Sequence, residues 1–533
     1  MPKGYLLIIL HAHLPYVRHP EYDRFLEEQW YFEAITETYL PLIKILDRMR
    51  EDGVKVKLTL SVSPTLANML EDPLLQQRYL QHLELCLRLA DRELERTRDW
   101  PDVNFLANMY RQLFEEARRI FTTRCQRRVA LALAELADAG YLELITCAAT
   151  HAFLPAVQAE PATARTQILT AVHEHQRIFG RKPKGLWLPE CGFYPGLDKV
   201  LAEAGIRYFF VDSHGLERAE PKPLFGVNAP IYCPSGVAAF GRNADTSQLV
   251  WSSKVGYPGD PYYREFHHDI GLDLEQQYLE EFQYAKGVRS HTGIKYYRIT
   301  GPGTDKRLYD PEQGRRTAQN HAHDFVARCR DQVIRSGSRM PMPAVLVSPY
   351  DAELFGHWWF EGPQWLDYVL REVAASGGEL ALITPGEYLA AYPVQQKAMP
   401  SPSSWGRNGY SEHWINPRTE WIFPALHEAA NRISQSVNKA RQQSLTAVEQ
   451  RVLRQAGREL LLAQSSDWPF IITNGTASEY AHRRLREHLN RFHNLLSSLE
   501  SRQVNEEHLA AVEYMDALFP ELDYNLFADT DGA

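Results

Sequence analysis

Apolar runs that end in proline and a carboxylate occur twice in this chain, and they constrain its fold more than any other feature. Residues 345–351 are Val-Leu-Val-Ser-Pro-Tyr-Asp, and residues 185–190 are Gly-Leu-Trp-Leu-Pro-Glu. Short apolar runs are typical of strands that are buried on both faces. Barrels of parallel strands carry their chemistry at the carboxyl ends of the strands. Glu190 and Asp351 are therefore the first candidates for catalysis.

Further strand patterns alternate with helical patterns along the first 400 residues. The helix predicted over residues 27–49, for example, separates a strand over 5–10 from another over 54–62. This order predicts parallel strands joined by helices. Counting the strands that end in polar residues gives seven, one fewer than the usual eight-stranded barrel; they lead to His11, Ser63, His151, Glu190, Asp212, Asp351 and Thr384.

Three stretches depart from this alternation and define the expected domains. Residues 73–139 are rich in Leu, Arg and Glu and predict a helical insertion, whereas residues 218–310 are rich in Gly, Pro, Tyr and Asp. Such a long irregular stretch is usually functional, and we expect it to shape a substrate cleft. Residues 401–533 carry long helical patterns. We therefore expect an α/β catalytic domain over 1–400 and a helical C-terminal domain over 401–533.

Composition excludes several classes of protein. The chain has 533 residues and a net charge of −9, which argues against binding to nucleic acid or to a membrane surface. Its first apolar run is short and stops at His11, so we expect a buried strand there and no signal peptide. The six cysteines form no CxxC pair, which is typical of free thiols in a reducing compartment. We expect a cytoplasmic protein.

The two acids and the aromatic residues near them point to sugar chemistry. Retaining glycosidases use two carboxyl groups, one as nucleophile and one as general acid and base. Trp358 follows Asp351 closely, while Trp405 and Trp414 lie among Gly, Ser, Asn and Arg rather than in an apolar run. Aromatic faces stack on the apolar faces of sugars, so we interpret these rings as part of a glucan-binding edge.

Histidines at strand ends leave two interpretations open. His11 and His13 form an HxH pair, and His151 and Asp212 also follow predicted strands. These four side chains could hold a zinc or manganese ion. They could equally bind sugar hydroxyl groups, which we favour because apolar residues follow the HxH pair. We expect no metal and no cofactor.

Five ordered blocks resemble the family-57 glycoside hydrolases and, within them, the 1,4-α-glucan branching enzymes. The blocks are HAHLPYVR (11–18), ITCAATHAFLP (145–155), GLWLPECG (185–192), SPYDAELFGHWWFEG (348–362) and residues 403–421. The resemblance spans nearly the whole chain. It implies an incomplete (β/α)₇ barrel with a helical insertion and a helical C-terminal domain.

The resemblance also implies roles for individual residues in a metal-free retaining mechanism. Glu190 is expected to be the nucleophile and Asp351 the general acid and base. The donor sugar is expected to contact His11, His13, His151 and Asp212. The rest of the glucan is expected to contact Trp251, Trp358, Trp405, Trp414 and, from the C-terminal domain, Asp467. A mobile loop that balances branching against hydrolysis is expected near residues 234–245, which lack the tyrosine expected at its tip.

The expected function is therefore α-glucan branching, by cleavage of an α-1,4 linkage and transfer of the fragment to a 6-hydroxyl group. The expected partner is an α-glucan, bound by a monomer or a small homo-oligomer. An α-amylase or a 4-α-glucanotransferase could use the same acid pair. A metal-dependent polysaccharide deacetylase built on His11, His13, His151 and Asp212, or a non-catalytic glucan-binding protein, are alternatives from other classes.

Overall fold

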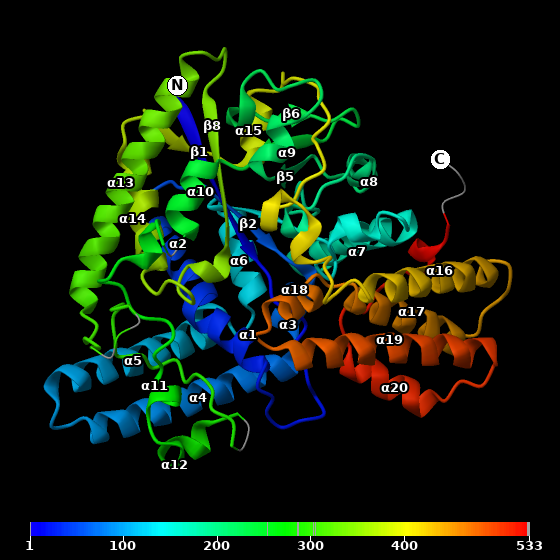
Figure 1. The fold of residues 1–533 in the computed structure, drawn as a ribbon, viewed down its shortest axis with the longest axis horizontal. Coiled ribbons are helices and arrows are strands. Elements are labelled where there is room, and N and C mark those ends of the chain that lie inside the picture. The colour runs from blue at the N-terminus through cyan, green and yellow to red at the C-terminus, as the bar shows by residue number, and fades with distance from the viewer. Residues whose placement is uncertain (1, 253, 285–286, 302, 304, 530–533) are drawn as a thin grey trace.

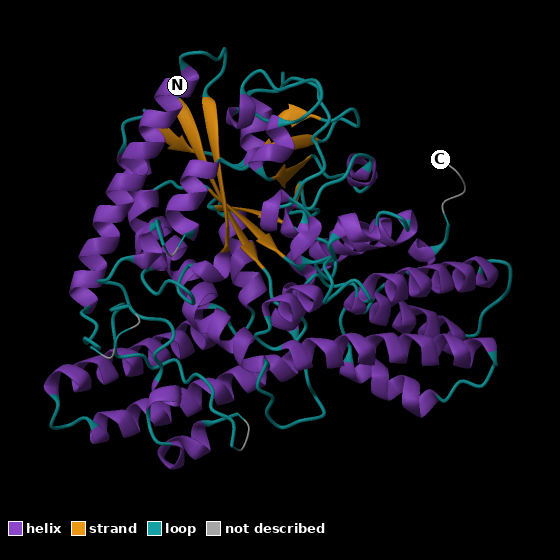
Figure 2. Ribbon diagram, viewed as in Figure 1, coloured by secondary structure: helices purple, strands orange, loops and turns teal. Residues whose placement is uncertain are grey.

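Parallel strands at the centre of the protein are surrounded by helices (Figures 1 and 2). The structure is a computed structural model that describes residues 2–252, 254–284, 287–301, 303 and 305–529. The remaining positions of the predicted cleft region 218–310 and of the C-terminal domain lie outside the described residues. The architecture is mixed α/β with a helical C-terminal domain.

The first sheet is built around β1 (Gly4–Ala12), which is buried along nearly its whole length. Its strand order is β3-β2-β1-β8, and β9 also pairs with β1. All of these pairings are parallel. The other strands are β2 (Leu58–Val62), β3 (Leu142–Ile145), β8 (Ala344–Asp351) and β9 (Leu380–Leu382).

The second sheet has the order β4-β5-β7-β6, in which only β6 runs antiparallel to its neighbour. Its strands are β4 (Gly185–Leu186), β5 (Tyr208–Val211), β6 (Ile231–Tyr232) and β7 (Ala238–Gly241). A parallel bridge between Thr146 and Leu186 joins the two sheets at one edge. After β7, the Asn243 N–H donates to the Val347 carbonyl of β8 at 2.8 Å. The two sheets therefore meet on both sides.

Helices cover the strands, and many of them begin at a proline because proline suits the first turn. The Ser63 side chain caps the helix that begins at Pro64, and the Asp72 side chain caps the helix that begins at Pro73; each accepts a backbone N–H group. The helices in this part are α1 (Glu28–Ala34), α2 (Leu40–Glu51), α3 (Pro64–Glu71), α6 (Val129–Asp138), α7 (Pro161–Phe179), α8 (Leu197–Glu203), α9 (Ser213–Glu217), α10 (Ala244–Trp251), α13 (Pro311–Gly337), α14 (Gly362–Ala375) and α15 (Pro385–Ala391).

The first part of the stretch predicted as an insertion, 73–139, forms a long helical hairpin, whereas α6 at its end packs against β3. Its helices α4 (Pro73–Arg96) and α5 (Pro101–Arg119) lie side by side along the lower edge of Figure 1, with α11 (Ile270–Asp273) and α12 (Gln276–Leu279) beside them. Leu87, Leu106 and Phe282 belong to one apolar cluster that joins the hairpin to the segment around α12. The insertion and part of the region predicted as a cleft loop are thus packed together.

The C-terminal helices form a second helical body. They are α16 (Ile422–Ala440), α17 (Ala447–Ala463), α18 (Asp467–Asn474), α19 (Ser478–Glu500) and α20 (Glu506–Met515). Leu460 and Leu485 from these helices share one apolar core cluster with Ile8 of β1. The Ser466 N–H donates to the His151 carbonyl at 3.0 Å, which holds the start of α18 beside the segment after β3. No helix among the described residues is long and apolar enough to cross a membrane.

All seven strands predicted from the sequence are present, and the structure adds two that were missed. The additional strands, β6 and β7, fall inside the region that we predicted as irregular. We expected a mobile loop at residues 234–245, and this expectation is wrong. The strand β7 occupies the centre of that segment, and Val237 to Phe240 are buried. The strand β7 is short, and its two alanines and its glycine have little strand preference, so the pairing with β5 supplies what the local sequence lacks.

Candidate functional site

Glu190 follows the short strand β4 and lies in a strained turn. Its φ of 60° is in the left-handed region, which is uncommon for residues other than glycine and often marks functional sites. The Trp405 indole N–H donates to one carboxylate oxygen at 2.7 Å, and the Ser466 hydroxyl donates to the other at 2.9 Å. The Trp405 backbone N–H also donates to the Glu190 carbonyl at 2.9 Å. The carboxylate is therefore held in one orientation.

Asp351 is the last residue of β8 and pairs in register with His11 of β1. Its side chain is open to solvent, unlike that of Glu190. The surrounding protein still removes part of the hydration of this carboxyl group, which raises the pKa of Asp351 to about 6. The positive charges of Arg242 and His13 act to lower the pKa. A carboxyl group with a raised pKa that remains open to solvent suits a group that exchanges protons with a substrate.

Burial raises the pKa of Glu190 to about 7, well above its usual value. The negative charge of Asp351 adds to this rise, while the hydrogen bonds from Trp405 and Ser466 oppose it. The two carboxyl groups are thus close enough to interact electrostatically. Raised pKa values at a pair of interacting acids are typical of active sites.

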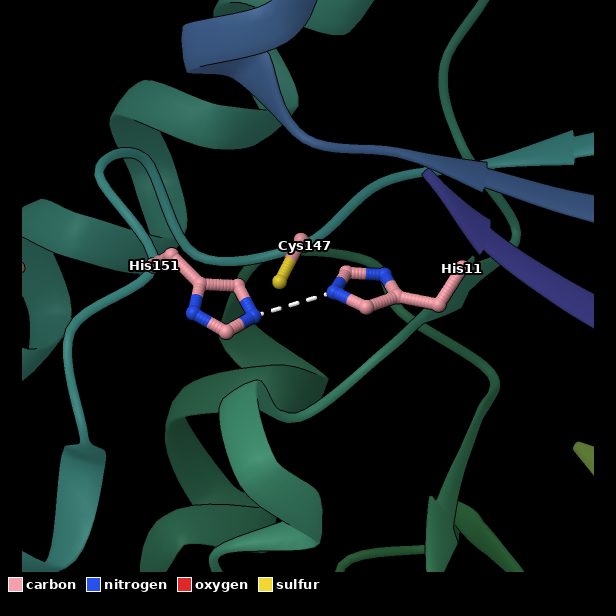
Figure 3. Close-up of side chains that lie close together, drawn as sticks. All are labelled: His11, Cys147 and His151. Atoms are coloured by element: carbon pink, nitrogen blue, oxygen red, sulfur yellow. Dashed lines mark hydrogen bonds between the residues drawn. The ribbon is translucent and has the colours of Figure 1, made fainter. Parts of the chain in front are cut away.

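The predicted histidines lie together beside Glu190. His11 Nε2 and His151 Nε2 are 2.9 Å apart, and the rings of His13 and His151 stack at 3.8 Å (Figure 3 shows the first pair). His151 Nδ1 lies 2.8 Å from the Ser466 hydroxyl, which in turn donates to Glu190. A continuous chain of hydrogen bonds therefore links His11 to Glu190.

Asp467 reaches this group from the first turn of α18. His13 Nε2 lies 3.1 Å from Asp467 Oδ2. Burial is the largest single effect on the pKa of His13 and would lower it, but the charge and hydrogen bond of Asp467 and the charges of other nearby acids together raise it. In the same way, burial would raise the pKa of Asp467, but the charge and hydrogen bond of His13 act with other nearby groups to lower it. The C-terminal domain thus supplies an ion pair to the site.

Asp212 lies in a separate part of the network. Its carboxylate accepts hydrogen bonds from Ser213, His214 and Arg242 at 3.0–3.2 Å. Among the described residues, Asp212 is absent from the groups of side chains that could share a metal ion. The metal interpretation built on His11, His13, His151 and Asp212 together is therefore not supported by their placement.

The predicted tryptophans occupy different environments. Trp358 is 55% exposed and stacks on Phe266 with ring centroids 4.4 Å apart. Trp251 is 67% exposed at the end of α10. Trp405 is half-buried against Trp187 and binds Glu190. Trp414 is only 1% exposed and stacks on Phe153. The expectation that Trp414 touches the glucan is therefore wrong: its ring supports the site from within.

Sequence reasoning missed three residues of this site. Ser466 bridges His151 and Glu190, and Arg242 binds Asp212 and acts on Asp351. Glu353 accepts hydrogen bonds from Tyr39 and from the His13 backbone. Ser466 and Glu353 carried a signal in the sequence, because each lies within two residues of a predicted site residue, Asp467 or Asp351. Arg242 carried none, since its partner Asp212 follows a different strand.

The arrangement can perform acid–base and nucleophilic chemistry on one substrate. It offers one buried, oriented carboxylate, one solvent-open carboxyl group and a polar wall of histidines. Exposed aromatic rings at Trp358 and Trp251 suit an apolar sugar face. Two carboxyl groups beside polar and aromatic side chains suit the cleavage of a glycosidic bond.

Comparisons with known proteins agree with this chemistry. Residues 7–400 match glycosyl hydrolase family 57, and residues 425–527 match the C-terminal region of 1,4-alpha-glucan branching enzymes. The chain is 35% identical over 529 residues to a 1,4-alpha-glucan branching enzyme of Thermococcus kodakarensis, covering 93% of this chain and 74% of that protein.

Solved structures extend the likeness to the whole fold. The alpha-amylase AmyC from Thermotoga maritima superposes with a TM-score of 0.93 at 42% identity and 99% coverage of both chains. A family-57 branching enzyme from Pyrococcus horikoshii superposes with a TM-score of 0.89 at 32% identity, covering 100% of this chain and 98% of that one. The family match alone spans more than half of the sequence. The chain therefore belongs to glycosyl hydrolase family 57.

Proposed function

We propose that this protein is a 1,4-α-glucan branching enzyme. The observation that carries the proposal is the match of residues 425–527 to the C-terminal region of branching enzymes. This same segment supplies Ser466 to Glu190 and Asp467 to His13. The part of the chain with the most specific match is therefore also part of the site.

The proposed reaction begins with cleavage of an α-1,4 linkage. The Glu190 carboxylate attacks the anomeric carbon while the Asp351 carboxyl group protonates the departing glycosidic oxygen. The hydrogen bonds from Trp405 and Ser466 aim the carboxylate at one point. The fragment with a free 4-hydroxyl leaves, and the rest remains as a glycosyl ester on Glu190.

Transfer completes the proposed reaction. Asp351, now a carboxylate, takes the proton of an incoming 6-hydroxyl group, whose oxygen attacks the anomeric carbon and releases Glu190. Two displacements retain the α configuration. Water competes at this step, so the yield of branches depends on how well the acceptor glucan excludes it. Exposed rings such as Trp358 are suited to hold that acceptor.

We further propose that the two sheets act as one incomplete (β/α)₇ barrel, within a catalytic domain over 1–400 and beside a helical domain over 401–533. The bridge at Thr146 and the hydrogen bond at Asn243 support closure through β1, β2, β3, β4, β5, β7 and β8. The described cysteines are all free, which fits work in a reducing cytoplasm on glycogen-type glucans.

An α-amylase is the second candidate, because the likeness to AmyC is strong over the full chain. Both activities would share Glu190 and Asp351 and would differ in the acceptor of the second step. The buried strand β7 replaces the loop that we expected to bias this choice. The ratio of transfer to hydrolysis is thus the property to measure.

Incubation with amylose separates the two candidates. Proton NMR of the product detects new α-1,6 linkages, and a reducing-end assay counts hydrolysis. New α-1,6 signals with few new reducing ends support the branching enzyme. A rise in reducing ends without α-1,6 signals would identify an amylase instead, and no change in either would reject both.

The proposed roles predict a bell-shaped pH profile of kcat/KM with its maximum between about pH 6 and about pH 7. The rate falls at lower pH as Glu190 gains a proton and at higher pH as Asp351 loses one. Because the two acids interact, the two limbs belong to the pair and not to single residues. Initial rates on a soluble maltooligosaccharide, measured at pH values on both sides of this maximum, test the prediction. A value of kcat/KM that keeps rising above about pH 8 would contradict the proposed roles.

Replacing Trp358 by alanine is expected to raise KM for amylose by about two- to tenfold with a smaller change in kcat, as expected for loss of one aromatic contact. Trp358 is 55% exposed, so its loss leaves the core intact. Trp100→Ala is a matched control, because Trp100 is 54% exposed on the helical hairpin. Equal KM values for both variants would remove Trp358 from the glucan-binding surface.

A further inference from the structure

His11, Cys147 and His151 bring three metal-ligating side chains to one place, and the proposed reaction makes no use of the thiol. One ligand atom from each residue lies within 4.8 Å of the other two. All three side chains are buried. Figure 3 shows the two imidazole rings facing one another with the Cys147 sulfur beside the gap between them. The residues come from β1 and from the segment directly after β3.

Hydrogen bonds on the far side of each ring prepare both histidines as ligands. His11 Nδ1 lies 3.2 Å from the Ser61 hydroxyl, and His151 Nδ1 lies 2.8 Å from the Ser466 hydroxyl. Each hydroxyl gives its own proton elsewhere, to the Thr146 carbonyl or to Glu190. Both hydroxyls can therefore accept from an Nδ1–H group, and a ring in that tautomer has its Nε2 lone pair free to bind a metal. This is how metal-binding histidines are usually oriented.

In the metal-free protein the two Nε2 atoms share a hydrogen bond of 2.9 Å, so one of the two rings carries a proton on Nε2. An ion that binds both nitrogens displaces that proton and takes its place. The sulfur of Cys147 is the added feature that favours a metal, because thiolate sulfur and imidazole nitrogen are both ligands that zinc binds in tetrahedral sites.

We propose that His11, Cys147 and His151 form a binding site for a zinc-class cation. The thiol gives up its proton to solvent as the metal–sulfur bond forms, so each ion bound releases at least one proton. Zinc–nitrogen bonds of about 2.0–2.1 Å place two tetrahedral nitrogen ligands roughly 3.3 Å apart, so the rings separate by only a few tenths of an ångström. Water takes the fourth position.

Occupation of this site inhibits glucan transfer, a consequence that rests on the proposed function. The ion occupies the Nε2 atoms of His11 and His151, two side chains that we expect to contact the donor sugar. Inhibition is expected to be reversible by a chelator, because removal of the ion returns a proton to the thiol and frees both rings. Binding itself does not depend on which reaction the enzyme catalyses.

Cobalt substitution tests the site without an activity assay. The reduced, metal-free protein is titrated with Co²⁺, and the thiolate-to-cobalt charge-transfer absorption is followed in the near ultraviolet. We expect a band that saturates at one ion per chain and disappears when Zn²⁺ is added. The band is expected to vanish in Cys147→Ala but to remain in Cys233→Ala, whose cysteine is equally buried and directly follows β6 of the second sheet.

Zinc affinity provides the second measurement. Cys147→Ala is expected to weaken Zn²⁺ binding in a calorimetric titration by at least about tenfold, the loss typical of removing even a supporting partner of a metal ligand. Circular dichroism checks that the variant is folded. A wild-type protein without the cobalt band, or a band equally strong in folded Cys147→Ala, overturns the proposal. Neither result depends on whether amylose is branched, so failure here leaves the proposed function intact.

Discussion

Glu190→Gln is expected to lower the rate of glucan transfer by at least about a thousandfold while leaving the fold unchanged. A glutamine has nearly the same shape, but its amide cannot attack the anomeric carbon, and removing a nucleophile of this kind removes the whole covalent route. The amide keeps one oxygen, which can still accept a hydrogen bond from Trp405 or from Ser466. The measurement is the rate of α-1,6 bond formation from amylose, with thermal unfolding as a check on folding.

Glu353→Gln is the matched control for this prediction. Burial also raises the pKa of Glu353 to about 7, and Glu353 lies two residues from Asp351 in sequence. A raised pKa alone therefore does not single out the nucleophile. Glutamine can still accept from Tyr39 and from the His13 backbone, so we expect Glu353→Gln to keep most of the activity. If both variants lose activity equally, Glu190 has no special role.

Asp351→Asn separates the two displacements. Loss of the Asp351 carboxyl group is expected to slow amylose cleavage by about a hundred- to ten-thousandfold, the usual effect of removing a general acid. A donor sugar with a leaving group that needs no protonation is expected to restore the first step, so that a glycosyl ester on Glu190 accumulates. Mass spectrometry of the intact protein detects that ester. No such recovery in Asp351→Asn would contradict its role as the acid.

Local sequence predicted the strands whose residues form a continuous apolar run. The strand leading to Asp351 and the strand leading to Glu190 were predicted because each is a continuous apolar run. The missed strand β7 is short and contains two alanines and a glycine. Its structure depends on the pairing with β5, a contact between segments far apart in the chain. Pairing of this kind has no local signal.

The candidate site shows the same division. Its two acids and three of its histidines carry a signal because each follows a strand or a strand-like run. Ser466 and Arg242 reach the site only because the C-terminal helices and β7 pack beside it. For Trp414 the prediction from the sequence was wrong. Its polar neighbours in sequence suggested an exposed ring, but Phe153 from another segment covers that ring. Tertiary packing decided each of these cases.

Gly356→Ala is expected to destabilise the protein by about 2–6 kcal/mol and to abolish most of its activity. Gly356 has a φ of +109°, which alanine adopts only with strain. A Cβ atom there would lie 1.8 Å from the Glu37 carbonyl oxygen, a backbone atom that cannot rotate away. The measurement is the midpoint of urea unfolding, followed by tryptophan fluorescence, together with the transfer rate per folded molecule.

Gly377→Ala separates backbone strain from the clash. Gly377 also has a positive φ, of +65°, but nothing lies within 4 Å of an added Cβ. We expect it to cost only about 1–2 kcal/mol and to leave the transfer rate unchanged. Gly356 differs because its neighbour His357 binds Glu37 at 2.6 Å and Trp358 follows at once. A shift of this segment moves the Trp358 ring, so Gly356→Ala should lose more activity than its stability explains. Equal effects in the two variants would show that the approach to Glu37 plays no part in shaping the site.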